Sequence, residues 1–466
     1  MPQTNILTRT QFEQYLERMQ VQREELLGSI RPLSSGMRNW KPNDEQMNIH
    51  ELLMHIGSSE CWLVSKLGQS VSIPSEVTLM RYLHQSRGIM RDQLNQFNDA
   101  QLEQEFDDGW HTDRVLKQIL AHEREHIEQI HDILAQWRLD LIARLAAERA
   151  FLFSSLLGFS EAELITLEPM AGWTVKDLLA HIAFWDGFHT NRMQMVADGR
   201  IREVMEVGDY DLFNERLLQE QKEMPLEQAF GMLQKERNGF SQLLKRLDDV
   251  ELQAQIRLSW GWRTHLRVWA KWRYLHDMDH AQQLKAWKES LPDMNRRAVG
   301  PAYLLRALLK ACHKEFVSLL SLLPESDWSS KPVCGVWTMK DLIGHLDAWA
   351  RVGGMALTQT FAGQTPIIEP ITDFEGWNMT EAAKRADLPW ETVWEAYETS
   401  HQALIAGLDE LSQEQLAVEF KTPWGANNSL FRWFTIWPLH EREHAIDVRH
   451  ALNLTRWPKR LTEHSQ

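Results

Sequence analysis

The sequence predicts an all-α protein that consists of three tandem, up-down four-helix bundles. Apolar residues recur at steps of three and four positions, as in segments 141–158 and 302–323, which is the spacing of one face of an α-helix. Helix-start signals precede several such segments, whereas the alternating β-branched runs that predict strands are scarce. In addition, long parts of the sequence recur along the chain, which indicates repeated units.

The clearest repeat lies in the last two thirds of the chain. WTVKDLLAHIAFW at 173–185 recurs as WTMKDLIGHLDAW at 337–349, and later residues keep this separation of 164 positions. The same separation relates Trp260-Gly261 to Trp424-Gly425 and His280 to His444. Because the separation is constant over more than 100 residues, the two segments align almost without gaps. We name them copy 2 and copy 3.

A shorter related segment, copy 1, precedes them. MNIHELLMHI at 47–56 matches the start of the motif, with Met47 in place of the tryptophan, and LAHEREHIEQI at 120–130 matches the ends of the longer copies. His55 and His122 are 67 positions apart, whereas the matching histidines of copies 2 and 3 are 95 apart, so copy 1 lacks about 28 residues between its second and last helices. The predicted domains are therefore 1–138, 139–292 and 299–466, the first one shortened.

Each copy is predicted to contain four helices of about 20 residues, which are the parts of a four-helix bundle. Asn48, Thr174 and Thr338 each stand three positions before an acidic residue and start the second helices with a capping-box pattern. Proline precedes the third helices of copies 2 and 3. The predicted helices are 8–30, 48–68, 76–97 and 112–136 in copy 1; 139–157, 174–198, 225–248 and 264–289 in copy 2; and 300–323, 338–362, 389–409 and 428–452 in copy 3.

The connections between these helices differ in kind. Residues 111–157 contain neither proline nor glycine, so we expect the last helix of copy 1 to continue into the first helix of copy 2. Residues 290–301 contain two prolines and a glycine, which is typical of a linker. In copies 2 and 3 a long link that contains Asn214 or Asn378 is expected to cross the bundle.

Composition limits the class of protein and its partners. The 466 residues carry 50 Lys and Arg against 65 Asp and Glu, a net charge of −15, which disfavours binding to nucleic acid or to anionic membranes. No signal-peptide core and no run of roughly 18 apolar residues is present. Three scattered cysteines fit a reducing compartment. We expect a cytoplasmic protein with a small-molecule partner; the sequence is compatible with an oligomer but does not determine one.

Nine of the 19 histidines occupy matching positions in the three copies. Each copy has one histidine on its second helix and an H-x-x-x-H pair on its fourth, and residues four apart project from one face of a helix. Imidazole is a common ligand of zinc, nickel and iron, and three protein ligands leave a position for water or substrate. The alternative is that these are core or interface histidines. The predicted ligands are His55, His122 and His126; His181, His276 and His280; and His345, His440 and His444.

Other motifs carry less weight. HEREH occurs twice and satisfies H-E-x-x-H, the zinc metalloprotease pattern, but copy 2 has HDMDH at the same place. The repeated tryptophans fill the cores or, in the case of Trp260 and Trp424, line a pocket. Asn214 and Asn378 either orient a ligand or form hydrogen bonds to the backbone. The sequence contains no glycine-rich phosphate loop, CxxC pair or Rossmann fingerprint, so no organic cofactor site is predicted. The residues alone assign no catalytic acid, base or nucleophile.

These motifs resemble the DinB-like superfamily of four-helix bundles, which includes bacillithiol- and mycothiol-dependent transferases and maleylpyruvate isomerase. The resemblance rests on WTVKDLLAHIAFW with the later LHDMDHAQQ, and on LAHEREHIEQI, and it covers nearly the whole chain as three tandem copies. In this family the three histidines bind a divalent metal ion. The resemblance therefore places metal binding on the nine histidines named above.

The resemblance also implies a metal-dependent enzyme that acts on a small electrophilic molecule, in detoxification or stress resistance. In one reaction, a low-molecular-weight thiol binds the open metal position as a thiolate and attacks the electrophile. In the other, a metal-activated water hydrolyses the substrate. The alternative from another class is a non-catalytic small-molecule-binding or scaffold protein with structural or vestigial metal sites. Zinc, nickel and iron all remain compatible with the histidines.

Overall fold

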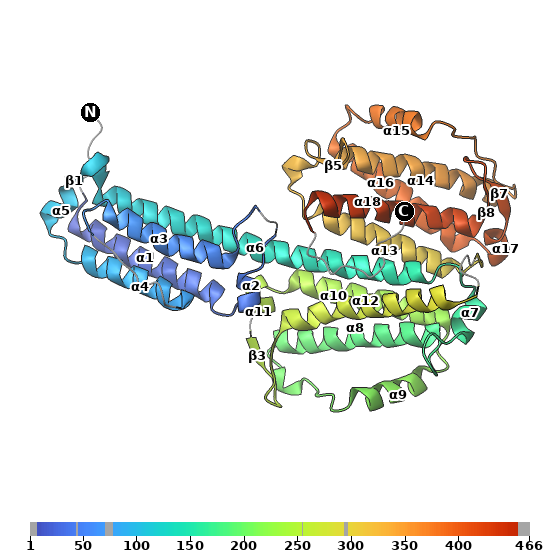
Figure 1. Ribbon diagram of the computed structural model, residues 1–466, viewed down its shortest axis with the longest axis horizontal. Coiled ribbons are helices and arrows are strands. Elements are labelled where there is room, and N and C mark those ends of the chain that lie inside the picture. The colour runs from blue at the N-terminus through green and yellow to red at the C-terminus, as the bar shows by residue number, and fades with distance from the viewer. Residues whose placement is uncertain (1–6, 43–44, 70–77, 254, 293–296, 455–466) are drawn as a thin grey trace. The chain divides into compact units, whose positions relative to one another are not determined.

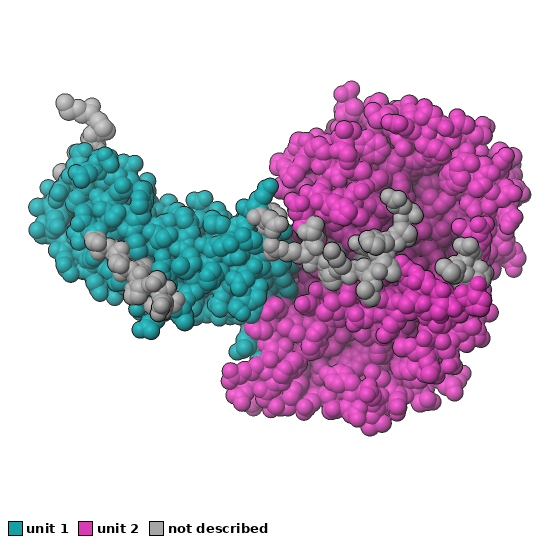
Figure 2. All heavy atoms as spheres, viewed as in Figure 1, with its two compact units in different colours: residues 1–137, 248–256 teal, residues 138–247, 257–466 magenta. Residues whose placement is uncertain are grey.

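Helices form most of the chain, as expected for an all-α protein (Figure 1). The computed structural model describes residues 7–42, 45–69, 78–253, 255–292 and 297–454. These residues form two compact units, which Figure 2 shows in different colours: residues 1–137 with 248–256, and residues 138–247 with 257–466. Copy 1 lies in unit 1 and most of copies 2 and 3 in unit 2. The division into three bundles remains a prediction.

Unit 1 contains helices close to the four that the sequence predicts for copy 1, although the predicted start of 76–97 lies outside the described residues. Three helices of this unit begin with a capping box, at Thr8, Asn48 and Asn98. Its apolar core includes Phe12, Met19 and Leu63. The elements are α1 (Arg9–Ile30), α2 (Ser35–Arg38), α3 (Ile49–Ser65), α4 (Leu79–Leu94), α5 (Asp99–Glu103), β1 (Glu105–Phe106), η1 (Asp107–Gly109), β2 (Trp110–His111), the first part of α6 (Thr112–Ser155) and α11 (Asp249–Gln253).

Unit 2 contains the helices predicted for copies 2 and 3. The capping boxes at Thr174 and Thr338 are formed, and Pro225 and Pro389 are the N-cap residues of their helices. The elements are the second part of α6, α7 (Glu161–Thr166), α8 (Val175–Ala197), η2 (Ile201–Glu203), α9 (Tyr210–Gln221), α10 (Leu226–Arg246), β4 (Arg263–His265), α12 (Leu266–Ser290), α13 (Ala302–Leu320), η3 (Glu325–Asp327), β5 (Pro332–Cys334), β6 (Trp337–Thr338), α14 (Met339–Phe361), α15 (Phe374–Ala383), α16 (Trp390–Glu410), α17 (Gln413–Leu416), β7 (Glu419–Lys421), β8 (Asn427–Ser429) and α18 (Leu430–Ala451); β3 (Gln255–Arg257) lies at the boundary of the units.

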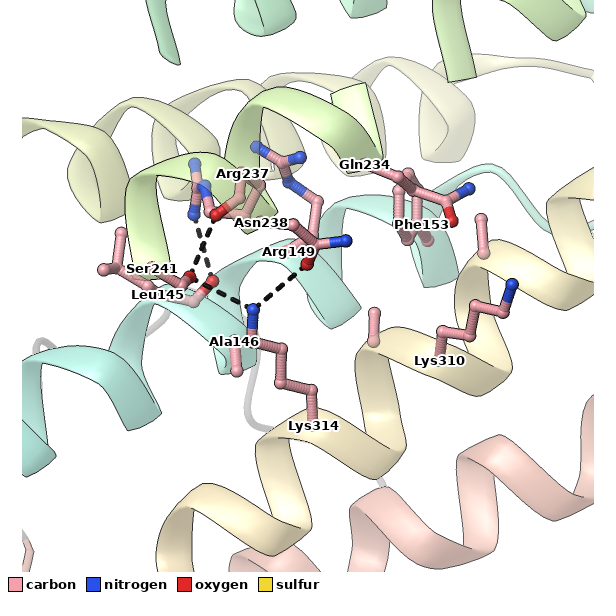
Figure 3. Close-up of a pocket in the computed structure, with 12 residues that line it drawn as sticks. Leu145, Ala146, Arg149, Phe153, Gln234, Arg237, Asn238, Ser241, Lys310 and Lys314 are labelled. Atoms are coloured by element: carbon pink, nitrogen blue, oxygen red, sulfur yellow. Dashed lines mark hydrogen bonds between the residues drawn. The ribbon is translucent and has the colours of Figure 1, made fainter. Parts of the chain in front are cut away.

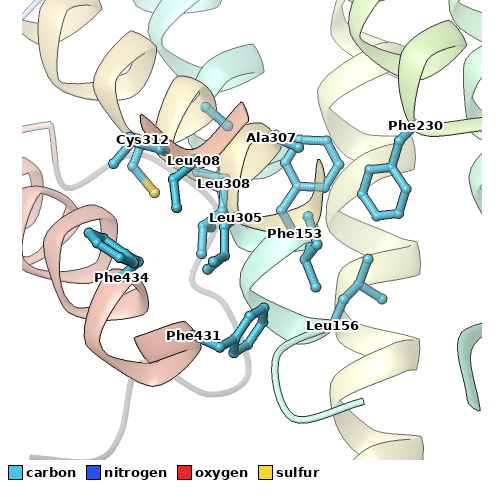
Figure 4. Packing of buried hydrophobic residues seen from close by; sticks show 14 of the residues in the cluster. Phe153, Leu156, Phe230, Leu305, Ala307, Leu308, Cys312, Leu408, Phe431 and Phe434 are labelled. Atoms are coloured by element: carbon cyan, nitrogen blue, oxygen red, sulfur yellow. The ribbon is translucent and has the colours of Figure 1, made fainter. Parts of the chain in front are cut away.

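One apolar core joins the helices of copies 2 and 3 inside unit 2. Phe153 of α6 stacks on Phe230 of α10 at a ring-centroid distance of 5.6 Å. The same buried cluster includes Leu305 of α13 and Phe431 of α18, as Figure 4 shows. The two longer copies therefore share their hydrophobic stabilisation and do not have wholly separate cores.

The connections partly follow the prediction. α6 runs unbroken from Thr112 to Ser155, as the absence of proline and glycine indicates. Part of the predicted linker, 293–296, lies outside the described residues. The long links contain helices, α9 and α15, that the sequence analysis did not anticipate; they pack against α8 and α14. Within the described residues, no helix combines the length and the apolar character needed to cross a lipid bilayer.

Short strands precede the last helices, a feature that the sequence analysis also missed. β1 pairs antiparallel with β2, and β7 with β8. The repeated Trp-Gly pair lies in the turn before the last helix of copies 2 and 3, where Gly261 and Gly425 have φ values of 88° and 85°. A side chain is disfavoured in this left-handed region, which explains the recurring glycine.

Candidate metal centres

The structure brings the nine predicted histidines together in three groups. In each copy one histidine comes from the second long helix and two from the last, at i and i+4. Within each group the candidate ligand atoms all lie within 4.8 Å of one another. The groups are His55 of α3 with His122 and His126 of α6; His181 of α8 with His276 and His280 of α12; and His345 of α14 with His440 and His444 of α18.

The Nε2 atoms of each group converge on the first histidine of the pair. In copy 2, Nε2 of His276 lies 3.1 Å from that of His181 and 3.0 Å from that of His280. The matching distances are 3.1 and 3.1 Å in copy 1 and 3.0 and 3.1 Å in copy 3. Around a tetrahedral zinc ion with bonds of roughly 2.0–2.1 Å, ligand nitrogens stand about 3.3 Å apart. The spacing therefore fits a small divalent cation.

A side chain three positions later fixes the orientation of the third histidine. Nδ1 of His126 lies 2.8 Å from Oε1 of Gln129, and Nδ1 of His280 lies 2.8 Å from Oε1 of Gln283. In copy 3, Nδ1 of His444 lies 3.0 Å from Oδ2 of Asp447. Because these oxygens accept the Nδ1 proton, Nε2 keeps its lone pair for a metal. The sequence carries this signal as H-x-x-x-H-x-x-Q/D, which the sequence analysis overlooked.

Burial favours the neutral form of His181, His345 and His440, and the neutral imidazole is the form that binds metal ions. Burial, followed by the neighbouring histidines and arginine, lowers the pKa of His181 to about 3 and of His345 to about 2. Burial and His444 lower the pKa of His440 to about 3. The Nδ1 atoms of His181, His276 and His345 are buried without a hydrogen-bond partner. In each group the three Nε2 atoms face one another. Neutral imidazoles cannot supply an N–H for every one of these contacts, whereas a bound cation would accept the lone pairs of all three nitrogens.

Tryptophans line the centres of copies 2 and 3. The ring of Trp173 meets that of His181 edge to face at 5.3 Å, and the ring of Trp337 lies 4.7 Å from that of His345. The ring of Trp185 lies 6.3 Å from that of His181, and its indole N–H donates to Oδ1 of Asn214 at 3.1 Å. The ring of Trp349 lies 6.4 Å from that of His345, and its indole N–H donates to Oδ1 of Asn378 at 3.0 Å. The two asparagines therefore hold aromatic walls in place.

The remaining repeated tryptophans have mixed roles. Trp269 and Trp433 are fully buried core residues. Trp424 is partly exposed, and its ring stacks on that of Trp433 at a centroid distance of 5.5 Å. The guanidinium carbon of Arg192 lies 5.9 Å from the centre of the Trp260 ring.

The centre of copy 1 is more open. His55 is exposed, whereas His181 and His345 are buried. Met47, which replaces the tryptophan of the longer copies, is itself 42% exposed. Among the described residues, which exclude 70–77, the aromatic rings that contact His55 are those of His122 and His126. The copy 1 centre thus has the histidines without the tryptophan wall.

The acidic residue that follows the first paired histidine faces a buried ion-pair network. In copy 1, Glu123 contacts Arg23 of α1 at 2.5 Å and Arg87 of α4 at 2.9 Å, and both arginines also contact Glu60 of α3. Each of the four long helices supplies one residue of this quartet. Glu123 is therefore engaged with arginines, which argues against the general-base role that H-E-x-x-H implies in metalloproteases.

Copy 2 has the same quartet with aspartates. Arg149 of α6 contacts Asp186 of α8 at 2.7 Å and Asp277 of α12 at 2.8 Å, and Arg237 of α10 contacts the same two carboxylates at 2.9 and 3.0 Å. Both aspartate side chains are 0% exposed. Sequence reasoning missed this network because the arginines come from helices outside the histidine motifs.

Copy 3 replaces the quartet. At the positions 164 residues further on stand His313, His401, Ala350 and Glu441. His313 bonds to Glu441 at 3.1 Å and to Glu398 at 3.0 Å, and its ring stacks on His401 at 3.8 Å. Burial alone would lower the pKa of His313, but the bonds to Glu398 and Glu441 outweigh it and raise this pKa to about 9.

Cys334 is a further residue near the third centre. Its Sγ lies 3.2 Å from Oδ2 of Asp447, the carboxylate that orients His444. Burial and Asp447 raise the pKa of this thiol to about 11. Cys334 is therefore a protonated hydrogen-bond donor at neutral pH.

One comparison with known proteins bears on these centres. Residues 308–447 match the family model of the DinB superfamily, which is a metal-binding superfamily. The matched segment contains His345, His440 and His444 and supports the superfamily for this part of the chain, but not three tandem copies. No curated protein and no solved structure matches the chain.

Proposed function

We propose that the chain is a metal-dependent enzyme of the DinB-like superfamily, with three tandem four-helix bundles at 1–138, 139–292 and 299–466. Each histidine group would hold one divalent ion: zinc, nickel or iron. One observation carries the proposal: in every copy, Nε2 of the first paired histidine lies 3.0–3.1 Å from Nε2 of each of the other two histidines of its group. The bonds of His126, His280 and His444 to their Gln or Asp partners support it.

The substrate we propose is a small electrophilic molecule. A bound ion of this kind supplies Lewis-acid chemistry, which lowers the pKa of a thiol or of water. The chain's own part is to orient the histidines and to exclude water with Trp173 and Trp185 in copy 2 and Trp337 and Trp349 in copy 3. These aromatic faces favour an apolar substrate.

The reaction is either thiol-dependent S-transfer or hydrolysis, with a role in detoxification or stress resistance. In both, a neutral imidazole set is required, and the low pKa values of His181, His345 and His440 favour it at neutral pH. Cytoplasmic location and a partner that is neither nucleic acid nor membrane belong to the same proposal.

A non-catalytic role suits copy 1 better. Its His55 is exposed and, within the part of the chain that the structure describes, has no ring contact with a tryptophan, unlike His181 and His345. We propose a structural or vestigial metal site there. If the metal sites of copies 2 and 3 were also structural or vestigial, the whole chain would be a non-catalytic binding or scaffold protein.

Elemental analysis of protein purified without a metal-affinity tag tests the metal. We expect up to three equivalents, and a loss of one equivalent in His280→Ala and one in His444→Ala. His50→Ala, at an exposed position of α3, is the matched control and should change nothing. Metal-free protein, or equal metal content in all variants, would contradict the proposal.

Activity assays separate the reactions. Monobromobimane with cysteine as the thiol tests S-transfer, and p-nitrophenyl acetate tests hydrolysis. Loss of turnover in His280→Ala and His444→Ala, with retention in His50→Ala, would support an enzyme. Metal-loaded protein that is inactive in both assays would favour the binding or scaffold role.

A further inference from the structure

A cavity of about 70 Å³ lies in unit 2 between α6, α10 and α13, and none of the nine centre histidines lines it (Figure 3). By the same measure a single water needs roughly 10–15 Å³, so there is room for several waters or for a small solute. The lining residues are Leu145, Ala146, Arg149, Phe153, Gln234, Arg237, Asn238, Ser241, Ala307, Lys310, Ala311 and Lys314.

The wall of this cavity is positively charged. Four of the lining residues are Arg149, Arg237, Lys310 and Lys314, and none is an aspartate or glutamate. The two arginines already pair with Asp186 and Asp277, which do not line the cavity. The lysines have no such compensation: among the described residues neither forms an ion pair.

Lys314 is the central cation. Its Nζ donates to Oδ1 of Asn238 at 3.3 Å and to Oγ of Ser241 at 3.1 Å, as Figure 3 shows. Ser241 gives its own proton to the carbonyl of Arg237 at 2.9 Å, so its oxygen is free to accept. An ammonium has three N–H donors, and these contacts use two. The third is available to a ligand.

The surroundings of Lys314 leave a positive charge without a counter-charge. Burial, followed by Arg237, Lys245 and Arg149, lowers its pKa to about 8. Every cause of this shift disfavours the ammonium, and no carboxylate contributes. Burying a charge without a counter-ion is costly, and an anion in the cavity would remove that cost.

Apolar side chains form a further part of the lining. Phe153, Ala146, Ala307 and Ala311 line the cavity beside Lys314. Lys310 lies one turn earlier on α13 and is exposed, which places a second cation toward solvent. We infer that this cavity is a binding site for a small oxyanion, a carboxylate or phosphate group, with Lys314 as its main contact. Short apolar substituents suit the remaining walls.

Isothermal titration calorimetry of the full chain tests this site. The probes are sodium butyrate and inorganic phosphate, at an ionic strength held constant with chloride. We expect one Lys314-dependent site for at least one probe, and Lys314→Met should weaken it by at least about tenfold, since one charge-assisted hydrogen bond is lost. Lys314→Arg should retain binding. Lys235→Met, which removes an exposed lysine of α10, should leave binding unchanged.

The two probes distinguish the sources of the anion. Tighter binding of butyrate would identify a carboxylate site and tighter binding of phosphate a phosphate site. If neither probe binds, if chloride alone gives the same heat, or if Lys314→Met binds as well as the unaltered chain, the inference is wrong.

A second measurement follows the unaltered chain and uses a variant only to assign the resonance of Lys314. After reductive ¹³C-methylation of lysines, the resonance lost in Lys314→Met is that of Lys314. Its titration midpoint should lie near 8 and should rise when the anion is saturating. A midpoint that does not move while heat is released would place the anion elsewhere and refute the assignment.

Discussion

The buried quartet of copy 2 should respond sharply to the loss of one carboxylate. We consider Asp186→Ala. Asp186 is 0% exposed and contacts Arg149 at 2.7 Å and Arg237 at 2.9 Å. Its removal leaves two buried guanidiniums that share Asp277 alone, with Arg273, whose pKa burial already lowers to about 10, close by. One buried cation then has no partner.

The expected loss of stability is large. Breaking a buried ion pair by removing one partner costs roughly 3–5 kcal/mol, because the remaining charge is left in a low-dielectric interior. Since about 1.4 kcal/mol is a factor of ten, the unfolding equilibrium of unit 2 should shift by more than about a hundredfold. Double variant Asp186→Ala, Arg237→Met should be less destabilised than the sum of its single variants, because the unpaired cation is gone.

Urea denaturation followed by tryptophan fluorescence and far-UV circular dichroism measures this loss. Both probes are needed because two units can unfold in separate transitions. Asp198→Ala, which removes an exposed partner of Arg200, is the matched control and should not move the midpoint. A loss below about 1 kcal/mol for Asp186→Ala, or strictly additive effects in the double variant, would refute the reasoning.

Three further predictions concern copies 2 and 3. The pKa of His313 in the folded protein, about 9, lies above its ordinary value. Protonated His313 should therefore contribute its full share to the stability of the fold below roughly pH 6.5, and this share should be lost as pH rises through 9. Urea midpoints measured against pH should show the loss, and His313→Arg should flatten the profile. Asp447→Ala should weaken metal binding at the third centre roughly 10–100-fold in a chelator competition, and exposed Glu443→Gln should not; equal affinities would contradict the role of Asp447. The pKa values of His181, His345 and His440 are lower in the folded protein than in the unfolded chain. In metal-free protein the unfolded chain therefore binds protons at a higher pH than the folded one, and the melting temperature should fall as pH drops from about 6.5 toward 3. A melting temperature that stays constant over this range would count against neutral imidazoles.

The long helices were predictable because their signals are local. Capping pairs such as Thr174 with Asp177 and the three-to-four-residue apolar spacing act within one helix. α9 was not predictable in this way, since Leu217 is its one buried residue and its apolar pattern is weak. Strands of two or three residues are likewise too short to display a period of two. The shared core of copies 2 and 3 depends on contacts between distant segments, which no local signal records.

The same division applies to the candidate site. The histidine pair is visible because i and i+4 share a helix face, and the third histidine because it recurs in three copies. Gln283 and its counterparts were also within reach, since they stand three positions after a ligand in every copy. The arginines of the quartets were not, because Arg149 meets Asp277 across 128 positions of sequence and only the packed helices bring them together.

At the quartet positions, copy 3 has other residues than copy 2 but keeps the pairing of a buried cation with carboxylates. Loss of the second-helix carboxylate, where copy 2 has Asp186 and copy 3 has Ala350, would leave one arginine in excess. In copy 3 both arginines are histidines. Burial and His313 lower the pKa of His401 to about 2, so it stays neutral, while His313 is an imidazolium held between Glu441 and Glu398. At the quartet positions of each copy, buried cations are thus matched by carboxylates although the residues differ, because breaking such a buried pair leaves a costly unpaired charge.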